Sequence, residues 1–99
     1  MRYEFKDKKL QALYTHEKGA EKYDEGVVDA FFNLIARIDA ATNEQDLRNL
    51  KSRRLEKLTG DRKGLYSMRL NKQWRLILKI VESKAGKYIE ILELSKHYE

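Results

Sequence analysis

Two arginines, Arg69 and Arg75, have the side-chain type and the spacing to hold a phosphate group. A guanidinium is always charged, and its planar fork of N–H donors matches the oxygens of a phosphate. The apolar residues around the two arginines alternate, so pairing Met68 with Leu76 across a turn at 71–73 gathers the apolar side chains on one face of a hairpin. The same register places Arg69 opposite Arg75 on the other face. Two like charges so placed are unfavourable without a nearby anion, so the pair predicts an anion site.

From the residues alone, a second interpretation of the two arginines is that they splay apart or pair with Glu90 on the next strand. The surrounding charge favours the anion site. Residues 51–75 hold nine basic and two acidic side chains, a net charge of +7, while the rest of the chain carries −2 and the whole chain +5. A field of this sign attracts polyanions, among which nucleic acid is the commonest in a cytoplasm. A solvated basic face that only maintains solubility is the alternative.

Two helices are predicted before the basic window. Asp7 can cap a first helix over about residues 8–15, with Leu10, Leu13 and Tyr14 on one stripe. A longer helix is predicted over about 24–41, where apolar side chains recur at helical spacing. These side chains are Val27, Val28, Phe31, Leu34, Ile35, Ile38 and Ala41. Residues 43–47 favour one further short turn.

From residue 53 onward the periodicity changes from helical to alternating. Strands are predicted over 66–71, 74–81 and 88–94, with a phase change near Leu92 and a turn at 83–86. Alternation also indicates a short strand over 2–5. The pattern predicts one α+β domain over residues 1–99, in which two N-terminal helices pack on one face of an antiparallel sheet.

Composition excludes several classes of function. The longest apolar stretches, 27–36 and 76–81, are interrupted or far shorter than the ~20 residues that span a bilayer. The chain has no cysteine and two histidines, which excludes a thiolate zinc site and an all-histidine metal cage. No Walker loop, dinucleotide fingerprint or nucleophile triad is present. We therefore expect no metal, no cofactor and no membrane partner, and the missing secretory signal and cysteines favour the cytoplasm.

The stretch 55–76, LEKLTGDRKGLYSMRLNKQWRL, resembles the centre of the RelE/ParE toxin superfamily, and most of all its HigB, or plasmid-maintenance killer, branch. There a Gly-Asp-Arg-Lys-Gly loop, a Ser-(Ile/Met)-Arg-(Ile/Leu)-Asn strand and Gln-Trp-Arg follow in this order. The resemblance covers roughly residues 5–95. HigB relatives more often end the last strand in Asp-Tyr-His, where residues 93–95 are Glu-Leu-Ser here. They also often carry a histidine near Glu56 and a lysine near Thr59, and both are missing from this chain.

The resemblance implies a fold, an activity and partners. The fold is RelE-like, with two N-terminal helices against a small twisted antiparallel sheet. The activity is that of a type II toxin, which cleaves messenger RNA in the ribosomal A site without a metal and so inhibits translation. The implied partners are the ribosome, the messenger RNA and a cognate helix-turn-helix antitoxin, through which alone the complex contacts operator DNA. In this chemistry the ribose 2′-hydroxyl attacks the adjacent phosphate, which needs a base, a cation for the phosphorane and an acid.

The resemblance also implies roles for single residues. Arg75 matches the family arginine assigned to phosphate stabilisation, and Arg69 matches a basic position on the preceding strand. The tail resembles that of RelE-like toxins, so His97 is the expected general acid and Tyr98 is expected to stack on a base. Further RNA contacts are expected from the basic side chains of Arg54, Lys57, Arg62, Lys63 and Lys96.

Two other functions remain as alternatives to cleavage. A ParE-like gyrase poison shares the fold but inhibits a protein target and cuts no RNA. A non-catalytic basic RNA-binding module is the other, although paired exposed aromatic residues on adjacent strands are missing. Glu56 could serve as a base beside Arg69, but a salt-bridged surface group is the simpler interpretation. Trp74 is expected in the core, and His16 in an exposed loop.

Overall fold

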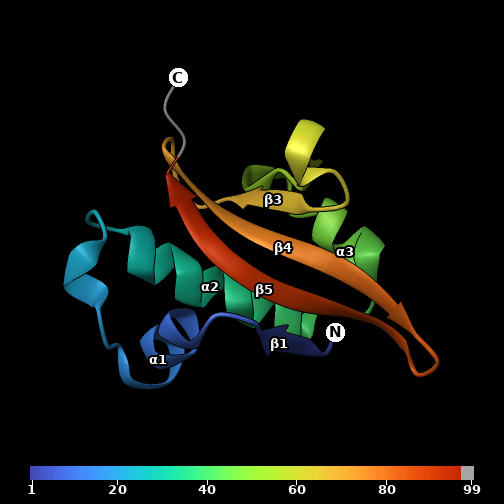
Figure 1. Ribbon diagram of the computed structural model, residues 1–99, viewed down its shortest axis with the longest axis horizontal. Helices are drawn as coiled ribbons and strands as arrows, with labels where there is room; N and C mark the ends of the chain where they lie inside the picture. The colour runs from blue at the N-terminus through green and yellow to red at the C-terminus, as the bar shows by residue number, and fades with distance from the viewer. Residues whose placement is uncertain (97–99) are drawn as a thin grey trace.

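The computed structural model describes residues 1–96, which form a mixed α+β fold (Figure 1). The α-helices of this part of the chain are α1 (Lys8–His16), α2 (Val27–Ala40) and α3 (Glu44–Arg48). The strands are β1 (Tyr3–Phe5), β2 (Glu56–Lys57), β3 (Tyr66–Arg69), β4 (Trp74–Ser83) and β5 (Gly86–Lys96). Short 3-10 turns lie at η1 (Ala20–Lys22), η2 (Lys51–Arg53) and η3 (Gly60–Arg62). None of these helices is long and apolar enough to cross a bilayer.

The helix ends follow from local capping. The Asp7 carboxylate accepts hydrogen bonds from the backbone N–H groups of Lys9 and Leu10 at 2.7 and 3.2 Å, which confirms the predicted N-cap. The second helix begins three residues later than its predicted start, because Gly26 adopts a left-handed conformation with φ of 83° immediately before it. The short third helix is capped by the Asn43 side chain.

The five strands form one sheet in the order β1-β5-β4-β3-β2. All neighbours are antiparallel except β1 and β5, which run parallel with Tyr3 opposite Ile89. The prediction of a purely antiparallel sheet is therefore wrong, and the sheet is mixed. Parallel neighbours need a crossover connection, and the long chain segment between β1 and β5 provides it.

The hairpin register predicted for β3 and β4 is confirmed. Met68 lies opposite Leu76 and Arg69 lies opposite Arg75. The β4–β5 register shifts by one residue next to Ile77, which explains the phase change near Leu92. The shift lets the end of β5 keep apolar residues on the core side beyond the irregularity.

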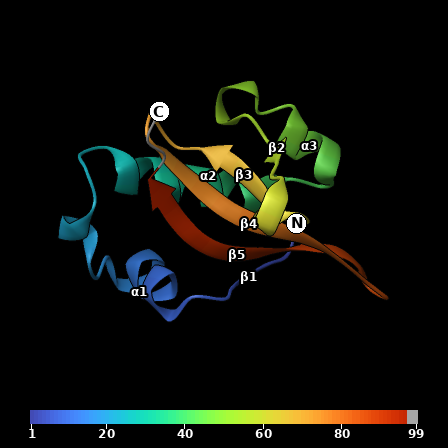
Figure 2. The same ribbon diagram turned by 45° about the horizontal axis from the view of Figure 1, so that its top comes forward.

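The hydrophobic core lies between the helices and one face of the sheet, and Figure 2 shows α2 behind the long strands β4 and β5. The fully buried side chains come from α1, α2, α3 and the core-facing positions of β3, β4 and β5. The largest are Phe31, Leu13, Leu34, Ile35, Ile38, Leu47, Met68, Leu76, Leu78, Ile89 and Ile91. The opposite, open face of the sheet carries Arg69 and Arg75.

Candidate functional site

A hollow of about 160 Å³ lies on the open face of the sheet, and we refer to it as the arginine hollow. It is lined by Glu56, Leu58, Arg62, Ser67, Arg75, Ile77 and Ser95. Leu58 directly follows β2 and Arg62 belongs to η3, while the other lining residues come from the four neighbouring strands β2, β3, β4 and β5. The pairing of Glu56 with Ser67, and of Arg75 with Ser95, places their side chains on the same face. The sheet therefore brings a carboxylate, two guanidiniums and two hydroxyls to one surface.

The two arginines of the hairpin converge on one backbone oxygen. The Asn71 carbonyl accepts a hydrogen bond from Arg69 Nε at 3.2 Å and another from Arg75 Nη1 at 3.0 Å. Neither arginine forms an ion pair with any of residues 1–96. Glu90 instead lies opposite Lys79 and pairs with Lys6 at 3.7 Å, so the interpretation in which Glu90 neutralises the arginines is wrong.

The turn that carries this carbonyl is held by the Asn71 side chain. Asn71 Oδ1 accepts hydrogen bonds from the backbone N–H groups of Gln73 at 2.9 Å and Trp74 at 2.8 Å. An asparagine side chain that bonds to the backbone two and three residues on is typical of tight turns. The acceptor that gathers the two guanidiniums is thus fixed in place, yet it is neutral. The positive charge at the hairpin tip stays available for an anion.

Glu56 is exposed, lines the arginine hollow and forms no ion pair with the described part of the chain. The interpretation of Glu56 as a salt-bridged surface group is therefore wrong. One neighbouring cation, Arg53, is engaged elsewhere: its guanidinium donates to the Leu70 carbonyl at 3.1 Å and to Asn33 Oδ1 at 3.0 Å. Glu56 is an uncommitted carboxylate beside Arg75.

Arg62 reaches the arginine hollow from η3 and forms an ion pair with Glu93 of β5. Glu93 lies opposite Ile77, which is only 3% exposed although it sits on the open face. The Arg62–Glu93 pair therefore borders the hollow on the β5 side. Among residues 1–96, Arg62 is the one expected RNA-binding residue in the same hollow as Arg75.

The glycine-flanked loop shapes this border. Gly60 and Gly64 have φ values of 66° and 92°, which side chains other than glycine rarely adopt. Hydrogen bonds from the Leu65 N–H to the Arg62 carbonyl and from the Leu58 N–H to the Leu65 carbonyl close the loop. Lys57 and Lys63 line a separate depression of about 510 Å³ beside this loop.

The other expected site residues lie apart from Arg75. Arg54 is exposed just after η2 and does not line the hollow. Lys96 lies opposite Trp74 on the core side, with its Nζ 3.3 Å from Asp24 and 5.9 Å from the centre of the indole ring. His97 and Tyr98 lie outside the described residues. Trp74 is half-buried at the edge of the core, as its alternation with apolar residues predicted.

Trp74 also fastens the end of the sheet to the loop before α2. Its indole Nε1 donates to Asp24 Oδ2 at 2.9 Å, and its ring packs edge-on against Tyr23 at 5.3 Å between ring centres. The hydrogen bond from Trp74, followed by that from Lys96, lowers the pKa of the Asp24 carboxyl from its ordinary value. Within residues 1–96, no cluster of three or more histidine, aspartate or glutamate side chains could hold a metal ion.

Comparison with known proteins identifies the family. Residues 3–91 match the family model of HigB-like toxins, described as RelE-like toxins of the type II toxin-antitoxin system HigB. The chain belongs to this family. It is also 40% identical over 85 residues to toxin HigB-1 of Vibrio cholerae serotype O1, an alignment that covers 86% of this chain and 90% of that relative. The chain is therefore a toxin of the type II class.

Solved structures share the fold of this HigB-like toxin at low sequence identity. A YoeB/ParE toxin from Agrobacterium tumefaciens matches with a TM-score of 0.60 at 16% identity and covers 99% of this chain and 100% of its own. The YoeB–YefM complex from Staphylococcus aureus matches with a TM-score of 0.60 at 21% identity, over 99% and 98% of the two chains. A YafQ variant from E. coli reaches 0.62 at 13% identity, over 97% and 93%.

The HigB-like toxin has polar residues in and near its arginine hollow that the sequence did not single out as site residues. Ser67 and Ser95 alternate with core residues on their strands, and Asn71 stands at the start of the predicted turn. Alternation could have placed the two serines on the open face of the sheet with Arg69 and Arg75, because residues at even spacing share a face of a strand. The turn-forming role of Asn71 could also have been predicted, since asparagine favours such turns.

Proposed function

We propose that this HigB-like toxin is a ribosome-dependent, metal-independent endoribonuclease that cleaves messenger RNA in the A site and so inhibits translation. The observation that carries the proposal is the arginine hollow, where Arg75 has no carboxylate partner within residues 1–96 and stands beside the unpaired Glu56. A cation and a carboxylate that do not neutralise each other are what a phosphate-cleaving site requires. The family relationship supports the same activity.

Cleavage divides into three tasks at one phosphate. The base removes the proton of the ribose 2′-hydroxyl while its oxygen bonds to phosphorus. The bond from phosphorus to the 5′-oxygen then breaks, and an acid supplies a proton to this leaving oxygen. We assign the base to Glu56 and the stabilisation of the phosphorane to Arg75, with Arg69 beside it. The acid is assigned to His97, whose ordinary pKa of about 6.5 suits proton transfer at neutral pH.

The resting contacts of Arg75 suit this role energetically. Its guanidinium donates to two backbone carbonyls, those of Asn71 at 3.0 Å and Trp74 at 3.3 Å. When the Arg75 guanidinium exchanges a neutral carbonyl for a phosphate oxygen, it gains a charge-assisted hydrogen bond. If it were paired with a carboxylate, breaking that pair would cost much of this gain. A donor aimed at charge that develops in the transition state contributes about 2.7 to 4 kcal/mol.

The remaining basic residues are proposed to hold the RNA around the cleaved phosphate. Arg62 borders the arginine hollow, while Lys57 and Lys63 stand at the adjoining depression. Arg54 and Lys96 add positive charge farther away, and Tyr98 is proposed to stack on a base of the codon. These contacts position the RNA and contribute affinity that depends on salt.

An antitoxin is the proposed protein partner. The solved YoeB–YefM complexes show that toxins of this fold are found bound to a second protein. We propose a helix-turn-helix antitoxin that presents an acidic or site-covering segment to residues 51–75 and carries the complex to operator DNA. The proposed location is the cytoplasm, where the ribosome is.

The proposed function is tested by the Arg75→Ala variant in single-turnover cleavage on programmed ribosomes. We expect the rate to fall by about 10² to 10³ with unchanged ribosome binding, because the lost contact forms in the transition state. Arg37→Ala is the matched control, since Arg37 is exposed in the last turn of α2 and away from the hollow. Undiminished cleavage would contradict the role of Arg75. Gyrase-dependent DNA breaks without RNA cleavage would replace the proposal by the ParE-like alternative.

A further inference from the structure

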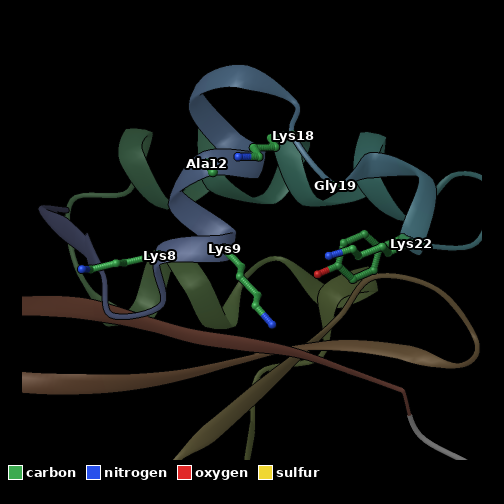
Figure 3. A pocket seen from close by; sticks show the side chains of 7 residues that line it. Lys8, Lys9, Ala12, Lys18, Gly19 and Lys22 are labelled. Carbon is green, nitrogen blue, oxygen red and sulfur yellow. The ribbon is translucent and has the colours of Figure 1, made fainter.

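Four lysines surround a second hollow, on the helix side of the molecule, which we refer to as the lysine hollow (Figure 3). It measures about 230 Å³ and is lined by Lys8, Lys9, Ala12, Lys18, Gly19, Lys22 and Tyr23. The lining includes no acidic side chain. This concentration is local, because residues 1–25 as a whole contain as many acidic as basic side chains.

The backbone after α1 builds the lysine hollow. Glu17 leaves the helix in the left-handed conformation, and the Lys18 N–H donates to the Ala12 carbonyl at 3.3 Å. Gly19 has a φ of 86°, and the Lys22 N–H donates to its carbonyl at 3.1 Å. The chain therefore turns back so that Lys18 and Lys22 line one hollow with the two lysines of the helix.

The four ammonium groups form no ion pair with residues 1–96. Nearby carboxylates are engaged elsewhere: Asp7 caps α1, and Asp24 accepts from Trp74 and pairs with Lys96. Glu17 and Glu21 are exposed and do not line the hollow. The charge of Asp7 still reaches Tyr23 in the wall of the hollow and offsets part of the positive charge there, but four ammonium groups outnumber this one carboxylate. The excess positive charge favours the binding of an anion.

The shape and place of the hollow indicate the kind of anion. Figure 3 shows that the lysine side chains do not converge on one point and that Lys8 extends away from the other three, which fits an extended polyanion better than a small ion. The Tyr23 ring in its wall packs 5.3 Å from the Trp74 ring, and Trp74 directly precedes Arg75. The lysine hollow and the arginine hollow therefore lie on opposite sides of the same end of β4.

We propose that the lysine hollow is a second RNA site, which binds backbone phosphates of the substrate strand outside the cleaved segment. A strand that passes around the end of β4 reaches both hollows. Lysine suits this task, because a mobile point charge binds phosphates without reading the sequence. The inference rests on the proposed function, since it assumes that RNA occupies the arginine hollow.

The salt dependence of RNA binding tests this second site. Wild type, Lys9→Gln and Lys22→Gln are titrated with uncleavable 2′-O-methyl RNA of about 20 and of about four nucleotides at several salt concentrations. With the long probe, each variant should lose about 0.7 from the slope of log affinity against log salt, the value for one contact to a single-stranded phosphate. With the short probe, confined to the arginine hollow, the slope should not change.

Lys84→Gln is the matched control, because Lys84 is exposed in the β4–β5 turn and its loss removes the same charge. If the lysine variants and this control show the same slope of log affinity against log salt with the long probe, the proposal is overturned. So would an equal loss of slope with the short probe. Loss of binding to polyglutamate with intact RNA binding would assign the hollow to an acidic protein instead.

Two further readouts separate this inference from the proposed function. All three variants change exposed side chains, so circular dichroism should show the wild-type fold. Single-turnover cleavage at saturating ribosomes should match wild type in the lysine variants, because the chemistry takes place in the arginine hollow. If wild type cleaves no RNA, the proposed function fails, while the slopes still decide whether the lysine hollow binds RNA.

Discussion

Arginines of the basic window have different roles because their side chains meet different acceptors. The guanidinium of Arg75 meets neutral carbonyls, and that of Arg62 meets the carboxylate of Glu93. Arg53 donates to the backbone of Leu70 and to the side chain of Asn33 on α2. We expect the loss of Arg75, which lines the arginine hollow, to affect ligand binding. We expect the loss of Arg53, which joins α2 to the end of β3, to affect stability.

Glu56 is tested as the general base by substitution with glutamine, which keeps the side-chain size and removes the charge. We expect single-turnover cleavage to slow by about 10² to 10⁴, the usual contribution of such a group. Stability should stay within about 0.5 kcal/mol, because Glu56 is exposed and forms no ion pair within residues 1–96. Glu25→Gln, an exposed carboxylate before α2, is the control. A Glu56→Gln rate within a few fold of wild type would remove its catalytic assignment.

Arg53 is predicted to be structural. Arg53→Ala leaves the partly buried Leu70 carbonyl and the exposed Asn33 side chain without this donor, and the expected loss is about 0.5 to 1.5 kcal/mol because water replaces part of it. Urea denaturation should show this loss in Arg53→Ala but not in Arg54→Ala, since Arg54 is exposed. Equal stability of the two variants would show that the Arg53 contacts contribute nothing.

The sequence predicted that Arg69 lies opposite Arg75, but it did not predict that Glu56 forms no ion pair within residues 1–96. Only one register buries the apolar residues of β3 and β4, so alternation was sufficient to place Arg69 opposite Arg75. Arg53, a cation close to Glu56 in sequence, instead contacts Asn33, which is 20 positions away. Local charge counts carry no such information. The roles of His97 and Tyr98 stay predictions.

At the scale of elements, the β3–β4 turn positions the site. Asn71 contributes to it twice, through a side chain that fixes the turn and through a carbonyl that gathers the arginines. The predicted hairpins were confirmed because their turns and alternation are local signals. The parallel pairing of β1 with β5 was missed because it joins Tyr3 to Ile89 across nearly the whole chain.

Substitutions of the Asn71 side chain test separately how it holds the turn and how charge at the hairpin tip affects RNA binding. Asn71→Ala removes the acceptor for one exposed and one partly buried backbone N–H group, so it should lower stability by about 0.5 to 1.5 kcal/mol. Asn71→Asp keeps an acceptor and should retain most of the stability, but its negative charge beside Arg75 should weaken RNA binding. Thermal melting and RNA titration measure the two effects. Wild-type RNA affinity in Asn71→Asp would show that the charge at the hairpin tip does not contact RNA.

At the scale of the whole molecule, one cluster connects three distant segments. Asp24 before α2, Trp74 at the start of β4 and Lys96 at the end of β5 contact one another at the end of the sheet where both hollows lie. The cluster closes the helix layer against the sheet there. It was not predictable from local pattern, because its members are at least 22 positions apart and only the folded chain brings them together.

The cluster makes the end of the sheet sensitive to acid, with a sign that follows from Asp24. Hydrogen bonds from Trp74 and then Lys96 lower the pKa of the Asp24 carboxyl below its ordinary value of 3.8. A pKa lowered in the folded state contributes stability that is present above the unfolded value and is lost as the pH falls through the folded value.

Trp74 is the only tryptophan, so its fluorescence reports the contact directly. We expect the emission to change with a midpoint below 3.8, while Asp24→Asn should lack this step. A fluorescence midpoint above 3.8, or the same step in Asp24→Asn while circular dichroism shows an intact fold, would mean that Asp24 does not hold the indole.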